Sequence, residues 1–222
     1  MANKIIVMDL NRCVGCTACN TACKTVNEVE IGNYWTKVVR VGPYPSFEGA
    51  NFPDVDWYYL PIQCQHCDNA PCVNVCPTGA SYFAEDGTVQ IDPEACIGCK
   101  TCIPACPYGI RYLDEKDLIV KKCNLCKDLT EEGGIPQCVS QCAGLAKWYG
   151  DIDEDPSMLS FKGGDDLTLG EACMPFTEDE VYSFPDGGNA PSFRYILRGK
   201  AWQDDTDFTL RQGGHGFCLP NY

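Results

Sequence analysis

The stretch CVGCTACNTAC, Cys13 to Cys23, places four cysteines in one short segment, and CIGCKTCIPAC, Cys96 to Cys106, repeats its spacing. Two residues separate the first three cysteines from one another, and three residues precede the fourth. A looser quartet lies in CQHCDNAPCVNVC, Cys64 to Cys76, and another is formed by Cys123, Cys126, Cys138 and Cys142. The four quartets hold all but two of the 18 cysteines in this 222-residue chain, so thiol chemistry dominates any account of it.

Disulfides, zinc and iron–sulfur clusters are the competing uses of so many cysteines. Disulfide scaffolds are typical of secreted proteins, but the start MANKIIVMDLN shows no small-residue cleavage site. Zinc sites use spaced pairs of cysteine or histidine around a single ion. Three cysteines at two-residue spacing with a fourth close behind match the bacterial ferredoxin run C-x2-C-x2-C-x3-C-P. The spacing therefore favours iron–sulfur cubes.

The chain is strongly acidic, with a formal net charge of −14. Four clusters with their thiolates would add about −8 to that charge. Such a charge argues against nucleic acid or anionic lipid as a partner. Because the start of the chain lacks a cleavage site, we expect no signal peptide, and because no run of 18 apolar residues exists, we expect no transmembrane segment of its own.

Internal repetition marks the region of the quartets. CPTGA at Cys76 and CPYGI at Cys106 align residue for residue, and each precedes a hairpin-like segment, YFAEDGTVQID or RYLDEKDLIVKK. Aromatic and β-branched residues predict further strands at 33–41, 56–62 and 193–199. The Pro/Gly-rich segment between the first two strands is interpreted as a loop or a partner-facing excursion. Long helices are not evident.

The four quartets in this order, with CDNAPCVNVCPTGA, CIGCKTCIPACPYGI and KCNLCKDLTEEGGIPQCVSQC, closely resemble the electron-transfer (beta) subunits of the dimethyl sulfoxide reductase family. The resemblance covers residues 5 to about 150. It implies four 4Fe–4S clusters and a role as the non-catalytic partner of a molybdopterin enzyme. Some relatives replace one cysteine of the third quartet with tryptophan and hold a three-iron cluster. Here all four cysteines of that quartet are present.

The resemblance also implies a nested pairing, in which the first quartet works with the fourth and the second with the third. Its ligand sets are cube 1, with Cys13, Cys16, Cys19 and Cys142; cube 2, with Cys23, Cys123, Cys126 and Cys138; cube 3, with Cys64, Cys67, Cys72 and Cys106; and cube 4, with Cys76, Cys96, Cys99 and Cys102. Proline follows the fourth cysteine in the two middle quartets only, which groups the quartets in the same way. By resemblance, cube 1 lies nearest the molybdenum partner and cube 3 farthest from it.

The expected fold class is α+β, with two nested bacterial-ferredoxin-like double-cluster modules of short helices and β-hairpins. The four-cluster domain spans residues 1–149, and an irregular acidic C-terminal extension spans 150–222. Within the domain, the first module takes about 1–30 and 118–149, the second about 60–117, and a β-rich insert occupies 31–61.

Several residues outside the ligand sets raise further possibilities. His66, inside CQHC, is expected near a cube without being a ligand. Cys173 and Cys218, the latter near His215, are interpreted as packed free thiols. Val14, Ile97 and Ile103 are interpreted as packing around the cubes. Basic residues next to ligand cysteines are either solvated or raise cluster potentials; they are Arg12, Lys24, Lys100, Lys121, Lys122 and Lys127.

No catalytic motif accompanies the cysteines, since the chain has no nucleophile elbow, dinucleotide fingerprint or phosphate loop. We therefore expect an electron-transfer subunit that serves a molybdopterin catalytic subunit of an anaerobic respiratory-type reductase. A membrane quinol-oxidising anchor subunit or a soluble donor would complete the complex. The alternative is a free-standing polyferredoxin that serves several enzymes, although a simple carrier would not need the 31–61 insert or the long tail. The expected location is cytoplasmic, or exported with the catalytic partner and membrane-associated through the complex.

Overall fold

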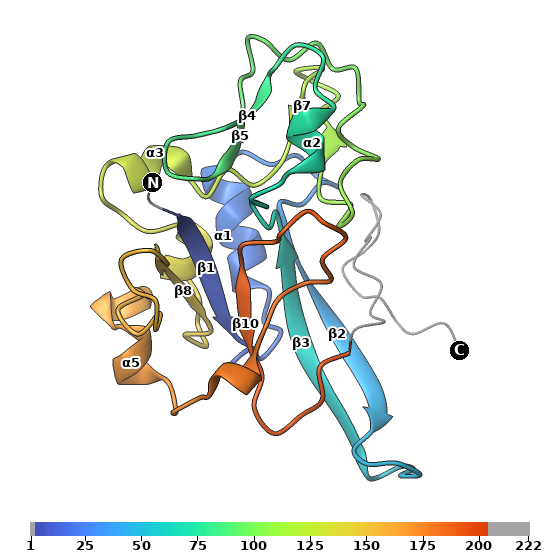
Figure 1. The fold of residues 1–222 in the computed structure, drawn as a ribbon, viewed down its shortest axis with the longest axis vertical. Helices are drawn as coiled ribbons and strands as arrows, with labels where there is room; N and C mark the ends of the chain where they lie inside the picture. The colour runs from blue at the N-terminus through green and yellow to red at the C-terminus, as the bar shows by residue number, and fades with distance from the viewer. Residues whose placement is uncertain (1–2, 204–222) are drawn as a thin grey trace.

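Strand β1 (Lys4–Asp9) is central to the largest sheet of the computed structural model, which describes residues 3–203. Four consecutive apolar side chains of β1 are completely buried. β1 pairs antiparallel with β8 (Lys147–Asp151) and parallel with β10 (Arg194–Ile196), which pairs with β9 (Val181–Tyr182). The strand order is β8-β1-β10-β9, so the sheet joins segments from both ends of the described chain (Figure 1).

The region after residue 150 is more regular than the sequence predicted. The strand expected at 193–199 is confirmed as β10, and its Tyr195 is completely buried. Tyr195 stacks on Phe184, with ring centroids 4.7 Å apart and planes within 5° of parallel. The prediction of an irregular extension is therefore wrong around β9 and β10, because these strands complete the sheet that β1 begins.

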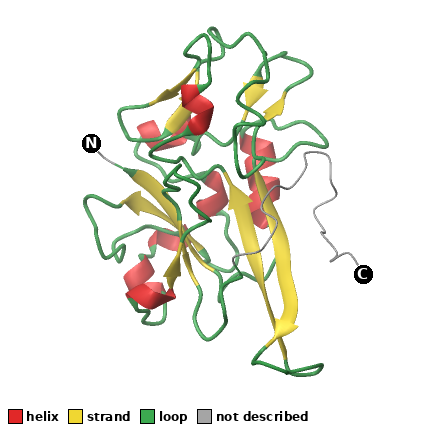
Figure 2. Ribbon diagram, turned by 45° about the vertical axis from the view of Figure 1, so that its right-hand side comes forward, coloured by secondary structure: helices red, strands yellow, loops and turns green. Residues whose placement is uncertain are grey.

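The two strands predicted in the insert form one long antiparallel hairpin of β2 (Thr36–Pro45) and β3 (Val55–Gln63). Its register runs from Thr36 opposite Gln63 to Pro45 opposite Val55, with an irregularity between Val41 and Tyr44. The hairpin projects away from the rest of the molecule, as Figures 1 and 2 show.

Both hairpins predicted after the repeated CPxG segments are present. The first joins β4 (Ser81–Phe83) to β5 (Val89–Ile91), and the second joins β6 (Tyr112–Leu113) to β7 (Val120–Lys121). They lie at the upper end of the molecule in Figure 1, with loops between them.

The helices of the described chain are short, as the sequence indicated. They are α1 (Ala18–Val26), α2 (Pro71–Asn74), α3 (Lys127–Glu131), α4 (Gln137–Ser140) and α5 (Leu169–Ala172), together with 3₁₀ turns at Gly164–Asp166 and Glu178–Glu180. None of the helices within residues 3–203 is long and apolar enough to cross a membrane. The fold is a mixed α/β arrangement of small sheets and few helices (Figure 2). Loops carry most of the cysteines of the described chain.

Candidate iron–sulfur cluster sites

All sixteen quartet cysteines lie within the described chain, and each is a free thiol. The C-x-x-C loops share one backbone feature: the residue just before the second cysteine is in the left-handed region in every quartet. Its φ is +69° at Gly15, +45° at His66, +64° at Gly98 and +59° at Leu125. The four loops thus share a left-handed residue at this position, although glycine occupies it in only two of them.

The first and fourth quartets lie together, although more than 100 residues separate them in the chain. Helix α1, which carries Cys19 and Cys23, packs against α4, which carries Cys138. A cavity beside them is lined by all four thiols assigned by resemblance to cube 1. Burial raises the pKa of the Cys13 thiol to about 11, and the thiols of Cys19 and Cys142 act in the same direction.

The set assigned to cube 2 is also close together and more deeply buried. Burial raises the pKa of Cys23 to about 12, and the thiols of Cys138 and Cys126 raise it further. The Cys123 thiol is buried, and burial followed by the charges of Cys23 and Cys138 raises its pKa well above the ordinary value.

The second and third quartets meet at the upper end of the molecule. Burial raises the pKa of Cys67 to about 12, with further increases from Cys64, Cys106 and Cys72. These four thiols are the set assigned to cube 3. Cys99 has Cys76 as an electrostatic neighbour. This is consistent with the set assigned to cube 4, which contains both thiols.

The order of these sites differs from the one expected by resemblance. Cys64 of the cube 3 set is an electrostatic neighbour of Cys123 in the cube 2 set. Arg111 has Cys72 and Cys64 of the cube 3 set and Cys102 of the cube 4 set as electrostatic neighbours. The resemblance implies that cube 3 lies farthest from the molybdenum partner, whereas these neighbours put the thiol set of cube 3 between the sets of cubes 2 and 4.

The two terminal sets each expose one thiol. Cys16 and Cys99 are the exposed cysteines among those described. Val14 and Ile97, next to them in CVGC and CIGC, are 65% and 67% exposed. Both side chains are thus largely exposed, although Val14 also lines the cavity of the cube 1 thiols, as expected for a residue that packs beside a cube.

Hydrogen-bond donors surround several ligand sulfurs. Asn189 Nδ2 donates to Cys67 Sγ at 3.2 Å, and Asn27 Nδ2 lies 3.5 Å from Cys23 Sγ and 3.6 Å from Cys126 Sγ. Backbone N–H groups also donate to the sulfurs of Cys76, Cys123 and Cys142. Donors of this kind stabilise thiolate, which is the form that binds iron. The sequence did not identify Asn189, because it lies far from any quartet.

His66 is buried, with 1% of its surface exposed, and its ring stacks on Phe193. Its Nδ1 accepts a hydrogen bond from the Val89 N–H at 3.1 Å, so Nε2 carries the proton of the neutral ring. Nε2 is buried and has no hydrogen-bond partner among residues 3–203. A buried donor beside Cys64 suits an anionic sulfur group nearby.

Buried cations provide a second test of whether these residues suit a cluster. Burial lowers the pKa of Lys147, but the thiolates of Cys138, Cys19 and Cys142 raise it above its ordinary value. Nη1 of Arg111 is buried without a hydrogen-bond partner in the described chain. Four thiols per set, with N–H donors and cations around them, fit anionic iron–sulfur cubes. In residues 3–203 no three His, Cys, Asp or Glu side chains converge on a single metal ion.

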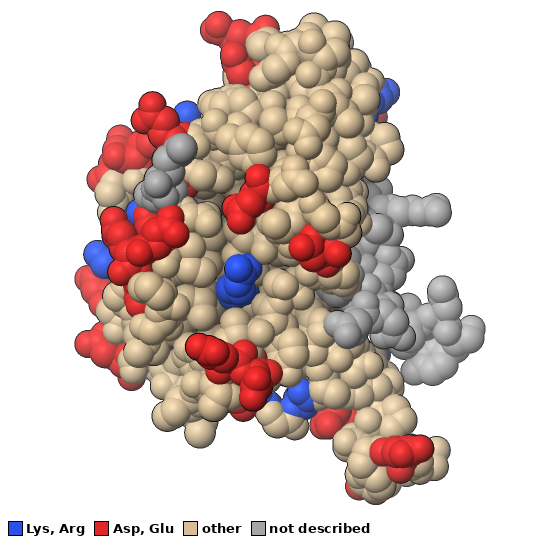
Figure 3. All heavy atoms as spheres, in the orientation of Figure 1, with Lys and Arg blue, Asp and Glu red and all other residues tan. Residues whose placement is uncertain are grey.

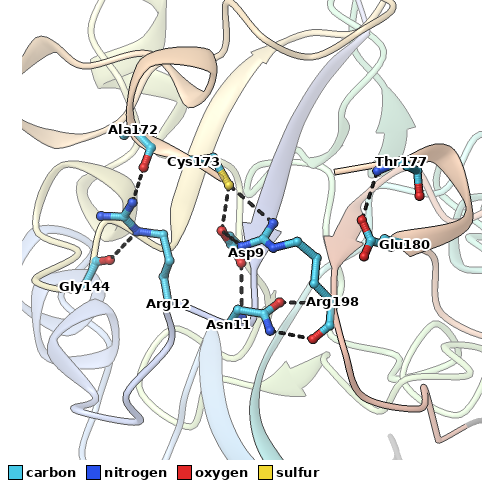
Figure 4. A network of polar contacts seen from close by, with 9 residues as sticks. All are labelled: Asp9, Asn11, Arg12, Gly144, Ala172, Cys173, Thr177, Glu180 and Arg198. Atoms are coloured by element: carbon cyan, nitrogen blue, oxygen red, sulfur yellow. Dashed lines mark hydrogen bonds and ion pairs between the residues drawn. The ribbon is translucent and has the colours of Figure 1, made fainter. Parts of the chain in front are cut away.

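Cys173 belongs to none of the four sets and takes part in a separate polar network (Figure 4). Its thiol donates to Asp9 Oδ2 at 2.7 Å, and Arg198 Nη2 contacts the same carboxylate oxygen at 2.7 Å. Arg12, which precedes Cys13, bonds the carbonyls of Gly144 and Ala172. The network thus ties the segment after residue 150 to the first cysteine loop. Cys218 and His215 lie outside the described residues.

Comparison with known proteins agrees with this geometry. Residues 55–152 match the model of a 4Fe-4S dicluster domain. The thiosulfate reductase electron transfer subunit PhsB of Salmonella typhi is 43% identical, over 68% of this chain and 77% of its own. A polysulfide reductase chain of Wolinella succinogenes is 40% identical, over 72% and 83% respectively. A sulfite dehydrogenase subunit of Allochromatium vinosum is 36% identical, over 90% and 85%.

The chain belongs to the family of iron–sulfur subunits of dimethyl sulfoxide reductase-type complexes. It is a non-catalytic electron-transfer subunit that works with a catalytic partner, and its cofactors are four 4Fe–4S clusters. This agrees with the expectation drawn from the cysteine spacing.

Proposed function

We propose that the sixteen quartet cysteines hold cubes 1 to 4 in two nested double-cluster modules, and that electrons pass along them in numerical order. The observation that carries the proposal is the cavity lined by Cys13, Cys16, Cys19 and Cys142, because the fourth quartet completes the thiol set of the first. The electrostatic neighbours of Cys23 and Cys67 support the sets of cubes 2 and 3. The clusters supply one-electron chemistry when bound, and the protein supplies thiols, N–H donors and exclusion of water.

The two ends of this array are the proposed points of electron exchange. Cys16 and Cys99 are exposed thiols in the terminal sets, and each has an exposed apolar neighbour that a partner subunit would cover. We assign the end at cube 1 to the catalytic subunit and the end at cube 4 to the electron donor or acceptor.

The catalytic partner is proposed to be a molybdopterin subunit of an anaerobic respiratory-type reductase, with a membrane anchor subunit or soluble donor at the other end. The names of the relatives, which include thiosulfate reductase and polysulfide reductase, support this assignment. The substrate would then be determined by the partner. Copurification from the native host should yield a large subunit with molybdenum in stoichiometric amount; isolation as a lone acidic protein would favour the free-standing carrier.

Iron analysis and one substitution test the ligand assignment. Anaerobically purified protein should contain about 16 iron atoms per chain. Cys142→Ser should alter the paramagnetic resonance of cube 1, whose other ligands lie near the N-terminus, and leave cubes 3 and 4 unchanged. Cys173→Ala is the control, because this thiol lies outside all four sets. Iron near 8 per chain, or an effect of Cys142→Ser confined to cube 2, would contradict the assignment.

A further inference from the structure

Four basic side chains are buried within residues 3–203, and three of them lie among the ligand thiols. Lys147, Lys122 and Arg111 are 1%, 3% and 2% exposed. The fourth buried cation is Lys37 on β2. A fully buried Lys or Arg is rare in proteins unless it is paired with an opposite charge.

None of the three has a carboxylate within ion-pair distance in the described chain. Their hydrogen bonds go to neutral groups. Lys147 Nζ bonds Gln63 Oε1 at 2.6 Å, Lys122 Nζ bonds the carbonyls of Cys123 and Val89, and Arg111 Nη2 bonds Ser81 Oγ at 2.9 Å. Within the described chain, the cysteine thiols are therefore the groups around them that can supply negative charge.

Each cation faces two neighbouring ligand sets. Lys147 lines the cavity of the cube 1 thiols and also interacts with Cys138 of the cube 2 set. Lys122 interacts with Cys123 of the cube 2 set and with Cys64 of the cube 3 set. Arg111 interacts with Cys72 of the cube 3 set and with Cys102 of the cube 4 set.

We propose that Lys147, Lys122 and Arg111 are fixed counter-charges, one in each interval between consecutive cubes, and that each raises the reduction potentials of the two cubes beside it. This inference rests on the ligand assignment proposed above. In this proposal the three residues are not iron ligands. They hold fixed positive charges that act electrostatically on the reduction potentials of the cubes.

The physical reason is that reduction adds negative charge to a site that is already anionic. A cation held in a dry, low-dielectric interior favours the more negative state far more than a solvated cation would. A cation between two cubes also offsets the repulsion between their charges. The reduction potentials of the two neighbouring cubes can then lie closer to each other, which suits electron transfer in either direction.

The repeat in the sequence places two of these cations at one equivalent position. Lys147 and Arg111 each lie five residues after the last cysteine of a quartet, in CAGLAK and CPYGIR. Ser81 occupies the same position in CPTGAS, and it is the residue that bonds Arg111. The position thus carries a cation after the third and fourth quartets, and a serine that bonds Arg111 after the second.

The test measures cluster potentials in purified, cluster-loaded protein by redox titration monitored by paramagnetic resonance. Lys147→Met should lower the potentials of cubes 1 and 2, Lys122→Met those of cubes 2 and 3, and Arg111→Met those of cubes 3 and 4. Each shift should correspond to at least a tenfold change in the reduction equilibrium, about 59 mV for a one-electron couple. Lys147→Arg and Arg111→Lys keep the positive charge, so the cubes in these variants should have the reduction potentials of the unaltered protein.

Lys127→Met is the matched control, because Lys127 also adjoins a cube 2 ligand but is partly exposed and paired with Glu131. If Lys147→Met does not accumulate, Lys147→Gln removes the charge while keeping a hydrogen-bond donor, and should give the same paired shift. Unchanged potentials in variants with full iron content, or an equal shift in Lys127→Met, would overturn the inference. Iron near 8 per chain in the unaltered protein would instead overturn the proposed cluster assignment.

Discussion

Adjacent lysines illustrate what the sequence could and could not predict at the scale of single residues. Lys121 and Lys122 both precede Cys123, and the sequence is compatible with a solvated or a potential-tuning role for either. β7 ends at Lys121, whose side chain is partly exposed, and Lys122 follows it with a buried side chain. Lys121 binds Asp114 at 2.5 Å, whereas Lys122 is buried beside the thiols. Spacing alone marks the cysteine quartets, whereas the two lysines are distinguished only by their burial.

The network around Asp9 gives a prediction at this scale. Cys173→Ala should keep full iron content and lower stability by about 1 kcal/mol, because one hydrogen bond to a buried carboxylate is lost. Arg198→Met should cost about 3–5 kcal/mol, since it leaves the charge of Asp9 unpaired. Thermal unfolding with parallel iron analysis measures both effects. Loss of about four iron atoms in Cys173→Ala would show instead that Cys173 is a ligand. The same iron analysis applies to Cys173→Ala with Cys218→Ala, which is also expected to retain every cluster.

The loop of cube 4 gives a second prediction. Gly98 has φ of +64°, and a Cβ there would collide with the carbonyl oxygen of Leu118. Gly98→Ala should therefore distort CIGC and remove about four iron atoms per chain. Gly32→Ala is the control, because φ is +92° but nothing lies within 4 Å of its Cβ position. Full iron content in Gly98→Ala would contradict this interpretation of the loop.

At the scale of elements, the local sequence pattern predicted the positions of strands and hairpins well. It predicted poorly which distant strands pair in a sheet. The hairpins after the CPxG repeats and the β2–β3 hairpin follow from composition and turn residues. The parallel pairing of β1 with β10 joins residues some 190 positions apart in the sequence. No local periodicity encodes that choice, which is why the sequence alone does not predict that the last strand completes the sheet.

The loop between β2 and β3, interpreted from the sequence as an ordered loop or a partner-facing excursion, exposes two aromatic residues. Phe47 is 63% and Phe52 is 87% exposed. Phe47→Ser with Phe52→Ser should weaken assembly with the catalytic partner by about tenfold or more, because exposed aromatic residues are typical interface anchors. Cluster content should not change. Ile31→Ser is the control, since Ile31 is also fully exposed but lies outside the hairpin. Equal assembly of both variants in a pull-down titration would exclude the hairpin from the interface.

The whole molecule combines an acidic surface with a core shared between apolar side chains and cysteine loops. Carboxylates far outnumber basic residues on the face drawn in Figure 3, in keeping with the net charge of −14. A partner surface with basic residues would attract this face before contact. Net charge and composition were predictable from the sequence, but the face on which the charge gathers was not.

Removal of iron is expected to destabilise the entire fold. Without clusters, three buried cations keep only neutral hydrogen-bond partners in the described chain, and burial of an unpaired charge is costly. Anaerobic treatment with a chelator should therefore lower the melting temperature measured by circular dichroism, with loss of tertiary signal. An iron-free chain that melts at the temperature of the loaded protein would contradict this coupling.

The closure of the sheet by β10 also has a consequence for the order of events during synthesis. On the proposed assignment, all ligands of cubes 3 and 4 lie between Cys64 and Cys106, so that module can be completed while later residues are still being made. Cube 1 must wait for Cys142, and β10 (Arg194–Ile196), the parallel partner of β1, is the last of the described strands to be made. The N-terminal cysteines therefore stay open to solvent and oxygen longest, although they are made first.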